Sequence, residues 1–362
     1  MRLDALALAL GCVALTACTG GTNLAGGEAD GRTEEGATEE ETIGDAPGDG
    51  AEADGADGGV EDGEDAGAEA DAEEAGADDG GVDPLPCGRT DECLPGSRCN
   101  DGLCESVLPT LDSTGADLTC LRDHPPPIPG VGTVALTVSV MDFTDEVGVE
   151  GATVDLFFDG IVDGSPDATV GPTDGGGRAS AGGVPRDNRI ASRVRRGDLP
   201  GGLVRETVQY DVRTPDADGA LLRVWSVDDR TYRLIPTILG ISPDAEHGVV
   251  FGKFDDCAGV PVEGFVVQLV LETGEDCRAL DERECRARYF QDRFFSRIDN
   301  QPYSSADGLF ALLQVPPGSW TARVMGRLAD DAPVFPYELL GEKRIVVIAD
   351  AVAIVTVEVL PE

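Results

Sequence analysis

Cysteine is the residue type whose number and spacing in this chain point most directly to chemistry. Four of the ten cysteines follow one another with the spacing C-x5-C-x5-C-x4-C: Cys87, Cys93, Cys99 and Cys104. Structural zinc sites usually take thiolates from closely spaced pairs, and the sequence contains no C-x2-C pair. A segment this short cannot bury a hydrophobic core, so we predict that two disulfides hold residues 87–105 together as a small Cys-rich module.

The first residues read as an export signal. An apolar run from Ala5 to Ala17 follows Arg2, and it is too short to span a bilayer, which needs about 20 residues. The run ends in Leu15-Thr16-Ala17-Cys18, which resembles the lipobox of bacterial lipoproteins. The resemblance implies that residues 1–17 are removed, that Cys18 is acylated and held in the lipid bilayer, and that Thr19 directs the protein to the outer membrane. Ordinary cleavage with an unmodified Cys18 is the alternative.

Removing Cys12 and acylating Cys18 leaves eight cysteines, an even number that favours disulfides in an exported chain. Four of these eight lie outside the Cys-rich module: Cys120, Cys257, Cys277 and Cys285. Cys277 and Cys285 are close enough to close a helical loop, and Cys120 would then clamp the linker 106–131 to Cys257. A bond between Cys257 and Cys277 is equally compatible with the sequence.

The sequence gives little support for catalysis. Histidine, the commonest general base and metal ligand, occurs only as His124 and His247. The chain lacks the nucleophile elbow, the metallopeptidase motifs and the glycine-rich phosphate loops that mark common enzyme families. We therefore expect no catalytic residue, no metal ion, no cofactor and no enzyme activity.

Charge is concentrated near the N-terminus. The chain carries 27 basic and 69 acidic side chains, and the segment from Thr19 to Pro86 holds 23 of the acids against Arg32 alone. Acids, glycines and alanines make up most of this segment, so it cannot bury a core, and we predict that residues 18–86 form a disordered tether behind the lipid anchor. The excess of acid also argues against nucleic acid as a partner.

Alternating apolar residues after the linker predict a series of short β-strands. In the run that begins at Val134, apolar residues alternate with others as in a half-buried strand. Further short runs separated by Gly, Pro and Asp turns predict a first β-sandwich over residues 132–247: 148–158, 179–184, 207–212, 221–227 and 232–239. The same order of patterns recurs over 248–362, which predicts an internal repeat and an all-β fold of tandem seven-stranded sandwiches.

The second half carries a recognisable series of motifs. Gly259 to Gly264 (GVPVEG) follows a strand pattern, Asp307-Gly308-Leu309-Phe310 comes later, and Val315 to Val324 reads VPPGSWTARV. This series resembles the carboxypeptidase regulatory-like domain, a transthyretin-like sandwich, over residues 248–361 and in part over 132–247. The alternation in the last motif places Trp320 in the core.

The Cys-rich module at 87–105 is similar to small modules near the N-termini of myxobacterial-type surface lipoproteins. From this resemblance we expect an interleaved pairing, first cysteine to third and second to fourth.

A basic and aromatic segment lies between two predicted strands of the second sandwich. Residues 278–297 read as an inserted helix with six arginines against four acids. Arginine pairs well with carboxylate and phosphate, so the segment is a candidate ligand patch, although a solvated helix would look the same. Its candidate residues are Arg278, Arg283, Arg286, Arg293, Arg297, Tyr289 and Phe294.

Two functions fit these patterns. The first is a non-catalytic lipoprotein of the cell envelope or surface that presents its sandwiches for structural or protein-interaction roles. The alternative is a surface lipoprotein that binds carbohydrate or lipopolysaccharide, with an acidic glycan as its ligand. An exposed Trp225, or an exposed aromatic row that includes Tyr289 and Phe290, would favour the alternative.

Overall fold

Alternating side chains build the first strand of the body as the sequence predicts. In β3 (Thr133–Asp142) the side chains of Val134, Leu136, Val138 and Val140 are buried. The computed structural model describes residues 86–88, 93, 95–121, 130–242, 244–280, 285–290, 302–329 and 337–359. The predicted signal peptide, Cys18 and the acidic tether as far as Leu85 lie outside the described residues. Among the described residues, no helix is long and apolar enough to cross a membrane.

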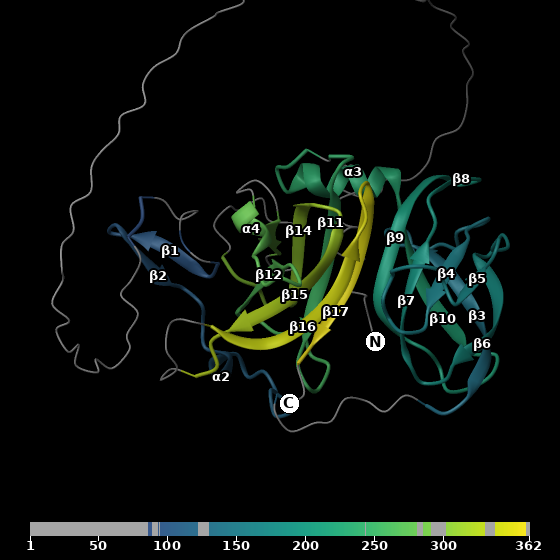
Figure 1. Ribbon diagram of the computed structural model, residues 1–362, viewed down its shortest axis with the longest axis horizontal. Helices are drawn as coiled ribbons and strands as arrows, with labels where there is room; N and C mark the ends of the chain where they lie inside the picture. Colours follow the sequence, from purple (N-terminus) through teal and green to yellow (C-terminus); the bar gives the residue numbers. More distant parts are fainter. Residues whose placement is uncertain are drawn as a thin grey trace, which may run out of the picture. The chain divides into compact units, whose positions relative to one another are not determined.

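The first sandwich is formed by β3 to β10 (Figure 1). One sheet has the order β6-β3-β10, and the other has the order β5-β4-β7-β9 with β8 paired to β9. Their apolar faces enclose one core, which includes Leu136, Val154 and Val224. The further strands of this sandwich are β4 (Val154–Phe157), β5 (Ala168–Val170), β6 (Arg178–Pro185), β7 (Arg189–Val194), β8 (Gly197–Leu199), β9 (Gly202–Arg213) and β10 (Leu221–Asp228).

The second sandwich is formed by seven strands of the described residues. One sheet has the order β13-β14-β11-β17, and the other has the order β12-β15-β16. A core that includes Phe254, Phe265 and Trp320 lies between them. The strands are β11 (Gly248–Asp255), β12 (Phe265–Val270), β13 (Arg286–Tyr289), β14 (Leu309–Val315), β15 (Gly318–Gly326), β16 (Glu338–Val347) and β17 (Ala351–Glu358).

The predicted repeat is visible in the strand pairing. In each sandwich the first strand pairs in parallel with the last, β3 with β10 and β11 with β17. The first strand also pairs antiparallel with a strand that follows the Asp-Gly turn, β6 in one sandwich and β14 in the other. The second sheets match as well, since β4-β7-β9 corresponds to β12-β15-β16. The two halves therefore share one topology.

The two sandwiches also share a sheet. Strand β17 lies between β11 and β9, and it pairs with both in parallel, so that Ala351 stands opposite Glu206 and Val352 opposite Val249. The two sheets of the first sandwich also meet where β10 pairs with β9 at Val227 and Asp228, so that twelve strands form one continuous sheet. All the described residues belong to one compact unit.

A helix covers part of this shared sheet, where a strand was predicted. Residues 232–239 were expected to be extended, but α3 (Asp229–Ile238) spans most of them. Asp228 caps the helix by accepting a hydrogen bond from the amide of Thr231 at 2.7 Å. Tyr232, Ile235 and Leu239 pack on side chains of both sandwiches. Because these three residues are spaced by three and four, the segment buries its apolar side as a helix.

The N-terminal part of the described chain contacts the second sandwich. Strands β1 (Ser97–Asn100) and β2 (Leu103–Ser106) form a hairpin held by Cys87–Cys99 and Cys93–Cys104 bonds, which is the interleaved pairing expected. The hydroxyl of Tyr337 lies 3.2 Å from the hydroxyls of both Ser97 and Ser106. After the hairpin, α2 (Leu111–Thr114) buries Leu111 in the core of the second sandwich.

The predicted helix over 278–297 is wrong where the structure describes this segment. Helix α4 (Cys277–Leu280) is a single turn, and Arg286 to Tyr289 form β13, an edge strand on β14. A disulfide joins Cys277 to Cys285 and closes the loop between the two elements. The buried Tyr289 is spaced from Ala287 by two residues, which is the period of a strand and not of a helix.

Candidate functional site

Three residues of the predicted arginine and aromatic patch lie in the described part of the chain. Tyr289 is only 4% exposed, and its hydroxyl accepts a hydrogen bond from the amide of Val267 at 2.9 Å. Burial raises the pKa of this phenol above its usual value. Arg278 and Arg286 are half-buried. The other predicted members lie outside the described residues: Arg283, Arg293, Phe294 and Arg297.

Both tryptophans are part of the fold. Trp320 is 2% exposed, as the alternation predicts, and its indole nitrogen donates to the carbonyl of Pro316 at 2.9 Å. Trp225 is 4% exposed and packs edge-on against Phe143, with ring centroids 6.0 Å apart. Neither indole offers a face on which a sugar could stack.

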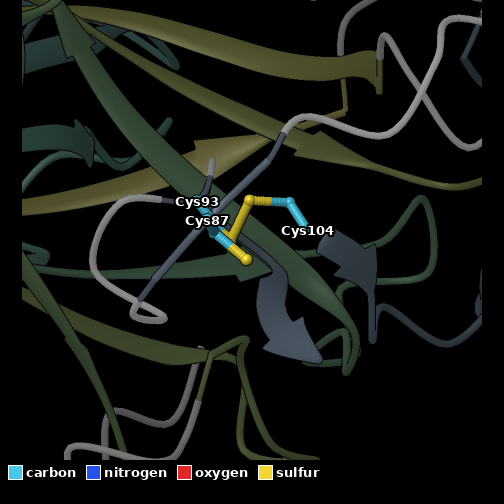
Figure 2. A group of neighbouring side chains, drawn as sticks. All are labelled: Cys87, Cys93 and Cys104. Atoms are coloured by element: carbon cyan, nitrogen blue, oxygen red, sulfur yellow. A yellow bond between two sulfur atoms is a disulfide. The ribbon is translucent and has the colours of Figure 1, made fainter. Parts of the chain in front are cut away.

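Three cysteine sulfurs gather in the Cys-rich module. The Sγ atoms of Cys87, Cys93 and Cys104 lie within 4.8 Å of one another (Figure 2), a separation that thiolate ligands of one metal ion could have. Each of them is already bonded to another sulfur. A disulfide sulfur carries no thiolate charge, so this cluster holds the hairpin and not a metal.

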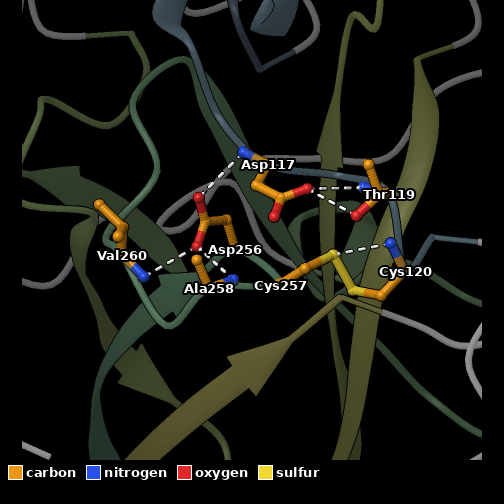
Figure 3. Close-up of a disulfide and its surroundings, with 7 residues drawn as sticks. All are labelled: Asp117, Thr119, Cys120, Asp256, Cys257, Ala258 and Val260. Atoms are coloured by element: carbon orange, nitrogen blue, oxygen red, sulfur yellow. Dashed lines mark hydrogen bonds between the residues drawn. A yellow bond between two sulfur atoms is a disulfide. The ribbon is translucent and has the colours of Figure 1, made fainter.

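A disulfide and a carboxylate together clamp the linker to the second sandwich (Figure 3). Cys120 is bonded to Cys257, which decides between the two pairings that the sequence allowed. Beside the bond, the Asp256 carboxylate accepts from the amides of Asp117, Ala258 and Val260 at 2.8 to 2.9 Å. Backbone bonding adds a contact from the amide of Cys257 to the carbonyl of Asp117 at 2.9 Å.

A network of buried charge joins the two sandwiches at one end of β9. The Arg205 side chain is 6% exposed and forms ion pairs with Asp229 of α3 and with Asp350, which lies between β16 and β17. Its guanidinium also lies 4.7 Å from the ring centre of Tyr232. Arg196 pairs with the same Asp350 at 2.5 Å. These pairs link the first sandwich, the helix and the second sandwich.

A second network joins the sandwiches near the other end of β9. The Lys343 ammonium of β16 lies 2.6 Å from Asp211 of β9, and Arg189 of β7 pairs with Glu358 of β17 at 2.5 Å. Burial raises the pKa of Asp211, while Lys343 acts in the opposite direction. These four charged side chains form ion pairs that link the first sandwich to the second.

An open groove lies beside the second network. Its volume is about 370 Å³, within the range of ligand-binding pockets. The first sandwich contributes one wall from the loop after β4, and β15 and β16 of the second sandwich contribute the rest. We call it the junction groove, and its residues are Asp159, Gly160, Ile161, Thr321, Glu342, Lys343 and Arg344.

The charges of the junction groove are balanced. Arg344 pairs with Glu272 at 2.9 Å, and Glu342 with Arg323 at 3.3 Å. The Asp159 carboxylate accepts from the amide of Ile161 at 3.0 Å, which fixes its loop. The lining residues include one hydroxyl, two carboxylates and two basic side chains, which can hydrogen-bond a ligand that enters the groove. Nothing local in the sequence marks it, because its walls come from segments far apart in the chain.

No family model matches the sequence, and no curated protein matches it. The likeness to the carboxypeptidase regulatory-like domain and to bacterial lipoproteins therefore stays a prediction from motifs.

Several solved structures resemble parts of the chain. The Bacillus anthracis TIE protein is 12% identical with a TM-score of 0.21, and the match covers 63% of this chain but only 34% of that one, about a third of its length. The shaft pilin SpaA of Lactobacillus rhamnosus GG is 11% identical with a TM-score of 0.19, covering 64% of this chain and 99% of the pilin. The minor pilin GBS52 of Streptococcus agalactiae is 10% identical with a TM-score of 0.18, covering 63% and 97%. TM-scores this low establish neither a common fold nor a common function.

Proposed function

We propose that this chain is a non-catalytic, lipid-anchored protein of the cell envelope or surface, and that its fused sandwiches are a body for binding another protein. The observation that carries this proposal is that the buried charged side chains form ion pairs between the two sandwiches. Both charged networks join one sandwich to the other, and the junction groove beside the second network is open between them.

The N-terminal sequence supports the anchored location. Acyl chains on Cys18 would hold the protein at a bilayer, and two or more chains anchor stably where one binds marginally. The acidic segment from Thr19 to Pro86 would then separate the sandwiches from the lipid by roughly 45 Å, from the square-root rule for flexible chains, and by more where its carboxylates repel one another. The disulfide pairs suit an oxidising compartment.

The glycan-binding alternative gains no support from the described residues. Trp225, Tyr289 and Phe290 are each at most 4% exposed, so none supplies the exposed aromatic face that this alternative requires.

The anchoring half of the proposal can be tested in cells. Full-length protein and Cys18→Ser would be labelled with a clickable palmitate analogue and fractionated into soluble and membrane pools. We expect label and membrane retention for the native chain, and loss of both for Cys18→Ser. Thr19→Ser is the matched control and should behave as the native chain does. Unlabelled native protein in the soluble pool would contradict the anchor.

A further inference from the structure

We propose that the junction groove binds an extended peptide of another protein, which adds to the free edge of β16 as an extra strand. This inference rests on the proposed function and names the kind of partner that the body binds. It is carried by the backbone groups that β16 turns toward the groove.

The hydroxyl of Tyr210 shows which backbone groups of β16 face away from β15. It accepts from the amide of Val346 at 2.7 Å and donates to the carbonyl of Val346 at 2.8 Å. Val346 stands opposite Ser319 in the antiparallel ladder. Because its amide and carbonyl are both used by Tyr210, this is a pair without ladder hydrogen bonds, and such pairs alternate along antiparallel strands.

The alternation places the next such pairs at Arg344 and Glu342, which stand opposite Thr321 and Arg323. The amides and carbonyls of these two residues therefore point away from β15 and toward the groove that both residues line. Among the described strands only β15 pairs with β16, and no other backbone hydrogen bond of the described residues reaches these two. They form a row of two donors and two acceptors, which is the pattern that an added strand pairs with.

The length of this free edge is limited on both sides. Tyr210 occupies Val346 at one end, and at the other end the regular ladder with β15 stops at Gly341, where the register shifts. The open part, residues 342–345, is about 13 Å long at the usual rise per residue. It fits an extended segment of about four residues.

The charges of the groove indicate which kind of peptide could bind there. The groove is lined by two acidic side chains, Asp159 and Glu342, and two basic ones, Lys343 and Arg344. A balanced groove does not favour the chain's own acidic segment 19–86, which has 23 acids. It favours a strand with little net charge, recognised through its backbone.

The first experiment finds the contact in cells. A photo-crosslinking phenylalanine analogue would replace Thr321 in the groove, and in separate full-length proteins Ser180 of β6 or Arg98 of β1. We expect an envelope protein to be crosslinked through Thr321 and not through the other two positions. Adducts only from Ser180 or Arg98 would overturn the groove and leave the proposed function standing. No adduct from any position would overturn both.

The second experiment tests backbone pairing. A synthetic peptide with the crosslinked sequence would be titrated into native protein, Arg344→Ala and Arg344→Pro. Alanine removes the side chain and keeps the amide, whereas proline also removes the amide that faces the groove, which an edge strand tolerates. We expect Arg344→Ala to bind within about threefold of the native protein and Arg344→Pro to bind at least tenfold more weakly. Equal binding by both variants would overturn the added strand.

A probe on the peptide side keeps the test independent of folding. In an added strand, every second amide points toward β16 and the others point away. N-methylation of the amides that point toward β16 should weaken binding to the native protein at least tenfold, and N-methylation of the others should weaken it only slightly. Equal effects of both kinds of methylation would again overturn the proposal.

Discussion

The hydroxyl of Tyr210 in the first sandwich bonds both the amide and the carbonyl of Val346 in the second, at 2.7 and 2.8 Å. One side chain of β9 thus replaces the neighbouring strand that β16 lacks at this position. The tyrosine is buried, and burial raises the pKa of its phenol, so it stays a neutral donor over the physiological range.

Tyr210→Phe should therefore destabilise the protein. The change leaves the amide and the carbonyl of the half-buried Val346 without partners, which costs about 2 kcal/mol of the free energy of unfolding. Urea unfolding measures the difference. Tyr289→Phe loses one hydrogen bond, at the amide of Val267, and should cost less. A change below about 0.5 kcal/mol for Tyr210→Phe would contradict the role of its hydroxyl.

Two arginines that pair with the same aspartate should contribute unequally to the free energy of unfolding. Asp229 pairs with Arg205, whose side chain is 6% exposed, and with Arg233, whose side chain is 66% exposed. Arg205→Ala leaves Asp229 and Asp350 without their shared buried partner, and we expect a loss of about 3 kcal/mol. Arg233→Ala removes an exposed pair and should cost about 0.5 kcal/mol or less. Thermal unfolding of both variants checks the ranking, and equal losses would contradict it.

The two disulfides that involve the second sandwich should contribute unequally to the free energy of unfolding. The Cys120–Cys257 bond spans 137 residues and the Cys277–Cys285 bond spans 8. On the chain-entropy model, replacing both cysteines of the long span by serine costs roughly 5 kcal/mol, against about 2.5 kcal/mol for the short span. Urea unfolding under non-reducing conditions gives both values. A larger loss for the short span would show that the linker clamp does not act through loop closure.

Acid should weaken the first sandwich through Asp155. This carboxylate is buried and accepts hydrogen bonds from Arg193 and Arg195 at 2.7 to 3.2 Å. Burial opposes its charge, but the two arginines outweigh burial and hold the pKa of Asp155 below its ordinary value of 3.8. Its stabilisation is therefore complete well above pH 3.8 and is lost as the pH falls through the lowered pKa.

The measurement is a comparison of the native protein with Asp155→Asn. The variant should be less stable by about 3 kcal/mol at pH 7, and the gap should narrow as the pH falls below 3.8. Asp198→Asn, at an exposed position of β8, is the matched control and should change stability little at either pH. A gap that stays constant with pH would contradict a charged Asp155 in the folded state.

Local patterns predicted those parts of the fold that depend on neighbours in sequence. The alternation in β3 and the inward position of Trp320 follow from the two-residue period of a strand. The segment 232–239 is helical, and not extended as predicted, because its buried residues are spaced by three and four. Asp228 and Thr231 form a cap that marks a helix start, and Pro236 argues against a central strand.

The site could not be predicted in the same way. Tyr210 and Val346 are separated by 136 residues, and the groove takes Asp159 and Arg344 from different sandwiches. The sequence pattern places each residue on a strand or a turn, but the pairing of β9 with β17 brings them together. In the predicted patch at 278–297, clustering in the sequence did not indicate exposure, since Tyr289 is buried.

The parallel pairing of β17 with β9 must also form late in folding. Ala351 meets Glu206 across 145 positions of sequence, and Val352 meets Val249 across 103. Contacts of such high contact order form slowly, because a long loop must close before they are gained. Strand β9 stays uncovered on one side until residues 351–358 have left the ribosome and, for an exported chain, crossed the membrane. The joint between the sandwiches is thus a late folding event, and an arrested or truncated chain would expose that edge to aggregation.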